Sequence, residues 1–341
     1  MKPSFKPFII PIFIPHLGCP HQCIFCNQRA ITGTSGAIPS TKKINSIVNE
    51  FLGYKRKNRS RVEISFFGGN FLGLSPNRIQ KLLDPIISFV ESKKIDGIRF
   101  STRPDTIDKD RLNLIRPYPV STIELGVQSM DDRVLKQANR GHTAKNTVHA
   151  VTLLKQEKYQ IGLQMMTGLP GDNDALCLET ARQIIALKPD FVRIYPTLVI
   201  DGSELAKLYQ KGGYQPLSLE KCVVQLKRLY LLFQENHINV IRMGLQASEA
   251  LDDPFTVLAG PYHPALGHMV FSKIFLDTAA KKIRKQTPPH DAVTLTVHPT
   301  SLSRMQGLNK KNIETLKQMF DIRTLDLKTD ASLDSDAVVV H

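Results

Sequence analysis

Apolar runs alternate with amphipathic segments from residue 7 to about residue 245, and no other feature restricts the possible fold as much. The apolar runs are rich in β-branched and aromatic residues, which predicts strands. These predicted strands are Phe8–Ile14, Val62–Phe67, Ile98–Thr102, Thr122–Val127, Gln160–Met166, Val192–Leu198 and Asn239–Met243. The predicted helices between them include Lys43–Tyr54, Arg78–Ser92, Thr143–Glu157, Asp174–Leu187 and Ser218–Gln234. Repeated strand and helix units imply a parallel sheet with right-handed crossovers, so we expect an α/β fold, a partial or full (β/α) barrel.

One edge of this predicted sheet carries short sequences rich in glycine, proline and polar residues. The sequences at the ends of five strands are Gly68-Gly69-Asn70, Arg103-Pro104-Asp105, Gln128-Ser129, Gly168-Leu169-Pro170-Gly171 and Tyr195-Pro196-Thr197. Any one of them could simply form a turn. Because barrel enzymes bind their ligands at the carboxyl ends of the strands, five such sequences at one edge predict a ligand-binding rim.

The pattern changes after about residue 245, which predicts three regions. We expect a barrel over residues 1–250, a linker and helix over 251–290, and a small α+β domain over 291–341. The last region has the order strand, helix, turn, helix, strand, strand, with the turn at Gly307-Leu308-Asn309-Lys310. This order is similar to a KH-type RNA module, whose central turn grips backbone phosphates. A generic small α+β domain is the alternative.

Charge and composition narrow the class of protein. With 341 residues and 42% apolar composition, the chain has enough material for a large domain and a smaller one. Its net charge of +14 favours an anionic partner such as RNA or a nucleotide, although surplus lysine can also be no more than a solvated surface. No apolar run approaches the roughly 18 to 20 residues that span a bilayer, so we expect no membrane contact.

Three of the five cysteines lie close together, as Cys19, Cys23 and Cys26, with the spacing C-x3-C-x2-C. A disulfide framework is not expected, because the total number of cysteines is odd and three of them are clustered. This arrangement predicts a reducing, cytoplasmic location. A 4Fe-4S cube takes a thiolate at each iron, so three cysteines would leave one iron open to a small molecule. The motif therefore predicts a catalytic iron-sulfur cluster.

Zinc is the competing interpretation of the same motif, because His16 or His21 could complete a tetrahedral site. Zinc ribbons usually contribute a second pair of cysteines from a distant part of the chain. Here the remaining cysteines, Cys177 and Cys222, occur singly inside helical patterns. We expect them to be buried thiols without a role in metal binding.

Several motifs resemble one known superfamily. The cysteine spacing, with Phe25 before the third cysteine, and Phe66-Phe67-Gly68-Gly69 are similar to the radical S-adenosylmethionine (SAM) superfamily. Four further motifs, over about residues 7 to 245, resemble the radical domain of the Elongator catalytic subunit. They are Ser101-Thr102-Arg103-Pro104-Asp105, Leu125-Gly126-Val127-Gln128-Ser129, Asn139-Arg140-Gly141-His142-Thr143 and Tyr195-Pro196-Thr197-Leu198-Val199. The chain also resembles oxygen-independent coproporphyrinogen oxidase, but this resemblance is weaker.

The resemblance implies a partial (β/α) barrel of the radical SAM type with two cofactors, a 4Fe-4S cluster and S-adenosyl-L-methionine. It implies that Cys19, Cys23 and Cys26 ligate the cluster and that an electron from it cleaves SAM to a 5′-deoxyadenosyl radical. The residues implied to contact the nucleoside or methionine are Phe25, Gly68, Gly69, Asn70, Ser101, Arg103, Gln128, Ser129 and Arg140. For Arg140 the implied partner is the methionine carboxylate or a nearby acid, and a salt bridge between loops is the alternative. Tyr195 is a candidate for hydrogen-atom transfer or stacking.

The chain departs from the family pattern at three points. Asn70 stands where a carboxylate or small hydroxyl commonly follows the glycine pair, and Ser101 stands where the Elongator pattern has an acid. Both departures affect expected contacts to the cofactor. The chain also ends without the acetyltransferase domain of the Elongator subunit, so we do not expect acetyl-coenzyme A chemistry.

Together these features predict a radical SAM enzyme that modifies a tRNA base, with an electron donor such as ferredoxin or flavodoxin as a further partner. One alternative is a radical SAM enzyme acting on a small anionic molecule such as a tetrapyrrole. The other is a non-catalytic iron-sulfur protein that binds RNA. The sequence leaves the target atom, the group transferred and the oligomeric state open.

Overall fold

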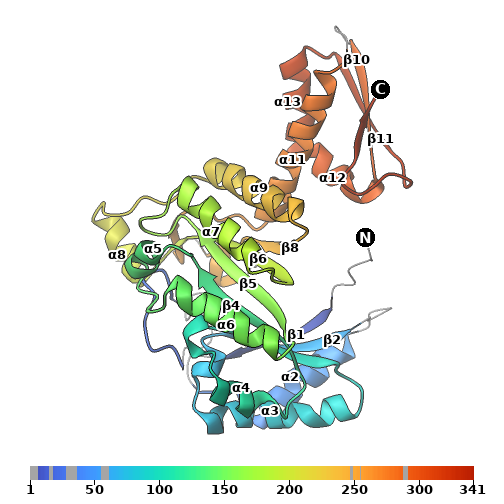
Figure 1. Cartoon of the computed structure of the whole chain (residues 1–341). Coiled ribbons are helices and arrows are strands. Elements are labelled where there is room, and N and C mark those ends of the chain that lie inside the picture. The colour runs from blue at the N-terminus through green and yellow to red at the C-terminus, as the bar shows by residue number, and fades with distance from the viewer. Residues whose placement is uncertain are drawn as a thin grey trace.

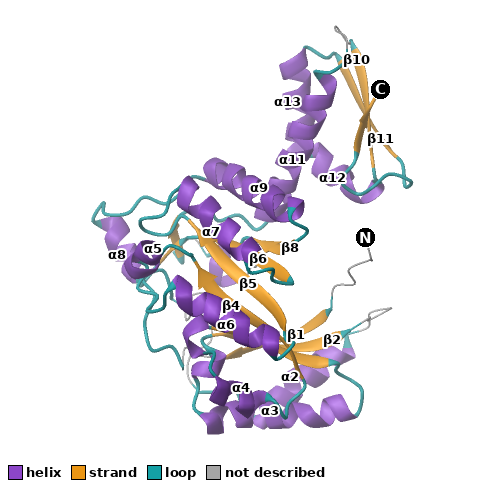
Figure 2. Ribbon diagram, in the orientation of Figure 1, coloured by secondary structure: helices purple, strands orange, loops and turns teal. Residues whose placement is uncertain are grey.

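The protein is built on a parallel sheet that curls into a partial barrel (Figures 1 and 2). The computed structural model describes residues 7–14, 18–27, 37–54, 61–245, 249–253, 255–286 and 291–341. The strand order in the main sheet is β1-β2-β3-β4-β5-β6-β8, and every neighbouring pair is parallel. These strands span Phe8–Ile14, Val62–Gly68, Gly97–Thr102, Val120–Gln128, Gln160–Thr167, Phe191–Pro196 and Asn239–Met243. The α/β partial barrel expected from the sequence is therefore confirmed.

Helices connect the strands and cover one face of the sheet (Figure 2). Those of this part of the chain are α2 Thr41–Gly53, α3 Pro76–Glu91, α4 Lys109–Ile115, α5 Asp132–Gln137, α6 Ala144–Gln156, α7 Asp174–Ala186, α8 Glu204–Gln210, α9 Leu219–Glu235 and α10 Glu249–Asp252. Single 3-10 turns, η1 at Phe71–Gly73 and η2 at Pro104–Thr106, follow β2 and β3. A short antiparallel pair, β7 Val199–Ile200 with β9 Val257–Ala259, lies beyond β6. Among the described helices, none has both the length and the apolar character that a bilayer crossing requires.

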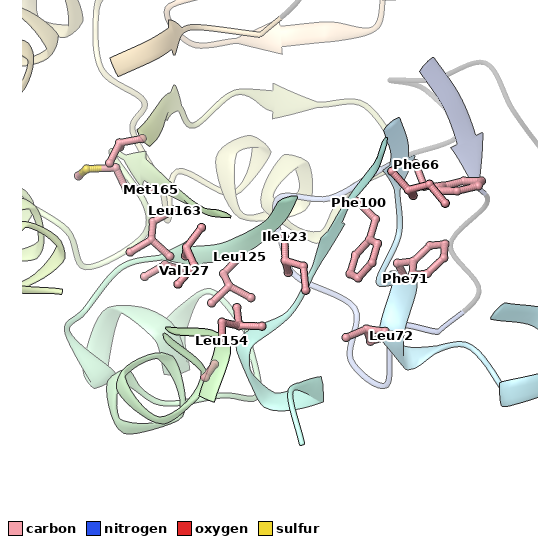
Figure 3. Packing of buried hydrophobic residues seen from close by; sticks show 14 of the residues in the cluster. Phe66, Phe71, Leu72, Phe100, Ile123, Leu125, Val127, Leu154, Leu163 and Met165 are labelled. Atoms are coloured by element: carbon pink, nitrogen blue, oxygen red, sulfur yellow. The ribbon is translucent and has the colours of Figure 1, made fainter. Parts of the chain in front are cut away.

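The core forms between the helices and the alternate strand residues that point toward them. Phe66, Phe100 and Ile123 are fully buried there, and so is Leu154 of α6 (Figure 3). Phe71 of η1 stacks on Phe100 with ring centroids 4.4 Å apart. Burial of such large apolar side chains is the main source of the stability of this layer.

The opposite face of the sheet carries charged residues in the alternate positions. Arg99 Nε donates to Glu63 at 2.7 Å, and Arg99 Nη1 lies 3.3 Å from Glu124. Arg193 of β6 adds a further ion pair on this face, because its Nε donates to Glu124 at 2.6 Å. Arg99 thus pairs with both neighbouring strands, and Arg193 reaches Glu124 across β5. This pairing satisfies charges that would otherwise be costly to bury.

The C-terminal region forms a second, smaller layered unit (Figure 1). Its three-stranded sheet has the order β11-β10-β12, with β10 parallel to β11 and antiparallel to β12. Its elements are β10 Ala292–Val297, η3 Pro299–Ser301, α12 Leu302–Gln306, η4 Leu308–Lys310, α13 Lys311–Phe320, β11 Thr324–Thr329 and β12 Val338–Val340. Helix α11, Leu266–Ile283, precedes this sheet. The order of elements is the one predicted, while the boundaries at residues 250 and 290 stay a prediction.

Candidate functional site

The predicted cysteine segment begins in a tight contact with the loop after β2. The side chain of Asn70 is fully buried, and its Nδ2 donates to the Gly18 carbonyl at 2.8 Å. Its Oδ1 accepts hydrogen bonds from Thr102 Oγ1 at 2.6 Å and from Arg103 N and Thr106 Oγ1, each at 3.0 Å. Asn70 therefore ties the start of the cysteine segment to the loop after β3. Its predicted contact to the cofactor stays a prediction.

Two glycines make this contact possible, and neither was singled out in the sequence. Gly18 has a φ of +104°, in the region that favours glycine. A Cβ on Gly73 would lie 2.0 Å from the Gly18 oxygen and 2.3 Å from Asn70 Nδ2. The sequence signal was the glycine itself, but only the fold brings Gly73 against a segment that is distant along the chain.

The middle of the cysteine segment rests on the loop between α5 and α6. Ile24 N donates to the Ala138 carbonyl at 3.2 Å, and Asn139 Nδ2 donates to the Gln22 carbonyl at 2.8 Å. Since this loop lies beyond the carboxyl end of β4, the cysteines are positioned at the rim that the sequence predicted.

The end of the segment is attached to the turn before α8 and to the first turn of α8 itself. Leu205 N donates to the Ile24 carbonyl at 2.8 Å, and Asn27 Nδ2 donates to the Asp201 carbonyl at 2.6 Å. The segment is thus fixed to loops that follow three different strands. Such support holds a short, irregular segment in one conformation.

The three thiols lie close enough to affect one another. Burial, together with the charges of Cys23 and Cys19, raises the pKa of Cys26 to about 12, although the charge of Arg140 acts in the opposite direction. Burial also raises the pKa of Cys19, whereas a hydrogen bond from the backbone N–H of Asn70 lowers it. Thiolates at these positions therefore need a bound cation or neighbouring positive charge.

Positive charge is supplied by two buried arginines. Arg140 Nη1 lies 3.1 Å from Cys23 Sγ, its Nη2 donates to the Gly126 carbonyl at 2.5 Å, and its buried Nε has no hydrogen-bond partner. Arg103 Nη2 donates to the Arg140 carbonyl, and its buried Nη1 also has no partner. Arg103 makes a bidentate pair with Asp105, with both distances 2.9 Å.

His142 stands beside these arginines as a neutral imidazole. Burial, together with the charges of Arg140 and Arg103, lowers its pKa to about 3. Its Nε2 lies 3.2 Å from the Val127 carbonyl, while its buried Nδ1 has no partner. No role was predicted for His142 from the sequence, although it lies within the motif that contains Arg140.

The polar residues at the ends of β3 and β4 differ in where their side chains point. Gln128 has a φ of +67°, and its Oε1 accepts from Gln164 Nε2 at 3.3 Å. Ser129 Oγ instead lies 3.3 Å from Thr180 Oγ1 of α7, so this side chain is used in packing between strand and helix. Ser101 is partly buried on the same face of β3 as Arg99. The cofactor contacts predicted for these residues stay predictions.

Phe25, which directly precedes Cys26, and Tyr195 of β6 share one apolar environment. Both pack against one buried cluster made of Val134, Ala138, Met166 and Leu169. The Tyr195 hydroxyl lies 3.5 Å from Nη1 of Arg193, which is paired with Glu124. Gly68 ends β2 with a φ of +112°, and Gly69 follows it. The two aromatic residues thus share one cluster, and the glycine pair directly precedes Asn70, which contacts Gly18.

The zinc interpretation required His16 or His21. His16 lies outside the described residues, and His21 is exposed with its ring against Gly141. Within the described ranges, no three or more His, Cys, Asp or Glu side chains are grouped as ligands of a single metal ion. The ligands of an iron-sulfur cube bind separate irons and so lie further apart than those of one ion. Cys177 and Cys222 are buried in α7 and α9, as predicted.

The donor set fits an anionic iron-sulfur cluster. Three thiols converge at the rim, and the buried guanidinium nitrogen of Arg140 beside them lacks a partner. Soft thiolate ligands suit iron, and buried positive charge suits a cluster whose three thiolates leave it negatively charged. The site is therefore suited to the cofactor that the motif predicted.

Comparison with protein-family models gives two matches. The model of the radical SAM superfamily matches residues 13–184, and that of the radical SAM C-terminal domain matches residues 189–275. The first match includes all three cysteines of the segment.

Individual proteins are also similar. An uncharacterized protein of Methanocaldococcus jannaschii is 30% identical over 231 residues, which is 64% of this chain and 70% of that protein. The tRNA uridine(34) acetyltransferase of the same organism is 27% identical over 248 residues, or 60% of this chain and 45% of the relative. This chain spans about half the length of the acetyltransferases that it matches. The solved structure of Elp3 from Methanocaldococcus infernus, with an N-terminal deletion, covers 80% of this chain and 63% of its own, with a TM-score of 0.59 and 20% identity.

Proposed function

Because this chain belongs to the radical SAM superfamily, we propose that Cys19, Cys23 and Cys26 hold a 4Fe-4S cluster and that the enzyme modifies a base of tRNA. The observation that carries this proposal is the cysteine segment itself, fixed at the carboxyl rim of the sheet next to buried positive charge. When bound, the cluster and SAM supply a 5′-deoxyadenosyl radical by one-electron cleavage of the C5′–S bond.

The chain's own residues would bind and orient the two cofactors. Gly68 and Gly69 would offer backbone groups to the methionine amine, because the absence of side chains permits close approach. Phe25 would pack near the adenine, and Gln128 would line the nucleoside pocket. Tyr195 would face the substrate, where its ring can stack on a base or its hydroxyl can give up a hydrogen atom.

The tRNA part of the proposal is supported by the relatives that are named for tRNA uridine(34) acetylation. The net charge of +14 also suits a polyanionic substrate. Because the similarity extends over only about half of those relatives, acetyl transfer is not included. The proposed reaction is a radical modification whose added group is not specified.

We place this chemistry in the cytoplasm, with a one-electron donor such as ferredoxin or flavodoxin. The C-terminal unit from residue 291 would assist by contacting RNA, in the manner predicted from its KH-like order of elements. Binding of tRNA should then weaken as salt concentration rises, because phosphate contacts release counterions.

The test uses tRNA from cells that lack this protein. After anaerobic incubation with the reconstituted enzyme, SAM and dithionite, nucleosides from the tRNA are compared by mass spectrometry with those from a Cys26→Ala reaction. A mass change that occurs only with the intact motif is expected. If 5′-deoxyadenosine forms but no nucleoside changes, tRNA is not the substrate, and a tetrapyrrole carboxylate is the next one to add.

A further inference from the structure

Arg140 differs from the other arginines buried beneath the rim. Its residue is only 6% exposed, yet it forms no ion pair with any carboxylate in the described part of the chain. Arg99 pairs with Glu63 and Glu124, and Arg103 pairs with Asp105. Burying a cation is costly unless an anion accompanies it, so the position of Arg140 implies an anion that is not a carboxylate of these residues.

The hydrogen bonds of Arg140 point to the identity of that anion. Nη1 is directed at Cys23 Sγ at 3.1 Å, a distance suited to a hydrogen bond to sulfur. Nη2 is held by the Gly126 carbonyl at 2.5 Å, and the backbone N–H of Arg140 donates to the Leu135 carbonyl at 3.0 Å. The guanidinium is therefore fixed from both sides with one N–H aimed at a cysteine sulfur.

We propose that Arg140 is a positioning residue that donates a charge-assisted hydrogen bond to the Cys23 thiolate and so raises the reduction potential of the cluster. This inference rests on the proposed function, since it requires a cluster on the cysteines. Hydrogen bonds to the sulfurs and nearby charge are among the factors that set such potentials. One added electron makes the cluster more negative, and a fixed cation beside a ligand stabilises that reduced form.

This role differs from the one that the sequence predicted for Arg140, which was to bind the methionine carboxylate. A bidentate grip on a carboxylate uses two parallel N–H groups of the guanidinium. In Arg140 both terminal nitrogens already have acceptors within the protein, and only Nε is without one. The geometry therefore favours the sulfur of Cys23 over a carboxylate as the main partner.

The test is a redox titration of the reconstituted protein without SAM, followed by the electron paramagnetic resonance signal of the reduced cluster. Arg140→Gln removes the charge, whereas Arg140→Lys keeps it. We expect Arg140→Gln to shift the reduction equilibrium about tenfold toward the oxidised form. For a one-electron couple, this shift lowers the reduction potential by about 59 mV. Arg140→Lys should restore most of this shift.

Arg133→Gln is the matched control, because it removes a guanidinium of α5 whose side chain is 77% exposed and paired with Asp131. Its potential should equal that of the wild type, since water and salt screen an exposed charge. If Arg140→Gln takes up no cluster while Arg140→Lys does, the charge is needed to hold the Cys23 thiolate, which supports the proposal.

Three results would overturn the inference. One is an unchanged reduction potential in Arg140→Gln together with a larger dissociation constant for SAM. This result would show that Arg140 binds the carboxylate of SAM. Another is an unchanged potential with unchanged SAM binding. The third is loss of the cluster from both Arg140 variants with wild-type circular dichroism, which would assign Arg140 to loop docking. Failure of the wild type itself to assemble a cluster would instead contradict the proposed function.

Discussion

At the scale of single residues, His142 couples the stability of the rim to pH. Its pKa is about 3 in the folded protein and 6.5 when unperturbed, with burial as the main cause. Between these values the unfolded chain binds a proton that the folded protein does not. Stability is therefore fully present above about pH 6.5 and is lost as pH falls below it.

We expect His142→Gln to reduce this loss, since glutamine can still donate to the Val127 carbonyl and does not titrate. From pH 6 to pH 5 the wild type should lose up to about 1.4 kcal/mol more of its free energy of unfolding than the variant does. Urea unfolding at pH 7, 6 and 5 measures the difference. His149→Gln, an exposed position of α6, should follow the wild type. Parallel pH curves for the wild type and His142→Gln would show that the buried imidazole does not control this dependence.

Gly73 offers a second residue-scale prediction. A methyl group there would collide with the Gly18 carbonyl and with Asn70 Nδ2, so the backbone contact that supports the cysteine segment must open. We expect Gly73→Ala to lose about 1–3 kcal/mol of stability, as overpacked sites do, and to bind clearly less iron per chain on reconstitution. Gly53→Ala at the end of α2 is the control, because no atom lies within 4 Å of its added Cβ. Equal iron contents for the two variants would contradict the role given to this contact.

At the scale of elements, η1 is held to the sheet mainly by aromatic packing. Phe71 lies between Phe66 and Phe100, with centroid distances of 5.0 Å and 4.4 Å, and all three side chains are fully buried (Figure 3). Since η1 follows directly on Asn70, this packing also positions the loop that supports the cysteine segment.

Phe71→Ala should therefore cost about 3–5 kcal/mol in the free energy of unfolding, which is the usual range for a buried phenylalanine. Phe255→Ala is the matched control, because Phe255 is 80% exposed, and it should change stability by no more than about 0.5 kcal/mol. Both variants are compared by urea unfolding at one pH. Similar losses for the two would mean that η1 is not anchored by its ring.

The strands of the main sheet could be predicted because each is rich in β-branched and other apolar residues, even where a polar or charged residue occupies an alternate position. For example, Phe8–Ile14 and Asn239–Met243 have the bounds expected from the sequence. Helices α4, α5 and α8 were missed, since two turns or fewer are too short to show helical periodicity. The pair β7 and β9 was missed as well, because strands of two and three residues that are distant in the chain carry little pattern.

At the scale of the whole molecule, the site depends on contacts that no local pattern contains. The cysteine spacing predicted the type of cofactor, but the contact of Arg140 with Cys23 joins residues 117 positions apart. Asn70 and Gly18 are 52 positions apart, and their hydrogen bond depends on how the loop after β2 packs. The residue types could be predicted from sequence, whereas the partners of their side chains required the fold.

Helix α11 links the two parts of the molecule through its two halves (Figure 1). Leu266 and Val270 belong to the core of the main sheet, whereas Phe275, Leu276 and Ala279 belong to the core of the C-terminal unit. Lys227 of α9 also pairs with Asp277 of α11 at 2.6 Å. A continuous helix shared by two cores restricts how far the C-terminal unit can move relative to the rim.

The central claim is that the cysteine segment holds a cluster that cleaves SAM. The most direct measurement is the amount of 5′-deoxyadenosine formed by the anaerobically reconstituted, dithionite-reduced protein, with Cys23→Ala and Cys177→Ala beside the wild type. We predict formation by the wild type and by Cys177→Ala, whose missing thiol lies buried in α7, and none by Cys23→Ala. An assembled cluster without 5′-deoxyadenosine, or zinc in place of iron, would contradict the account.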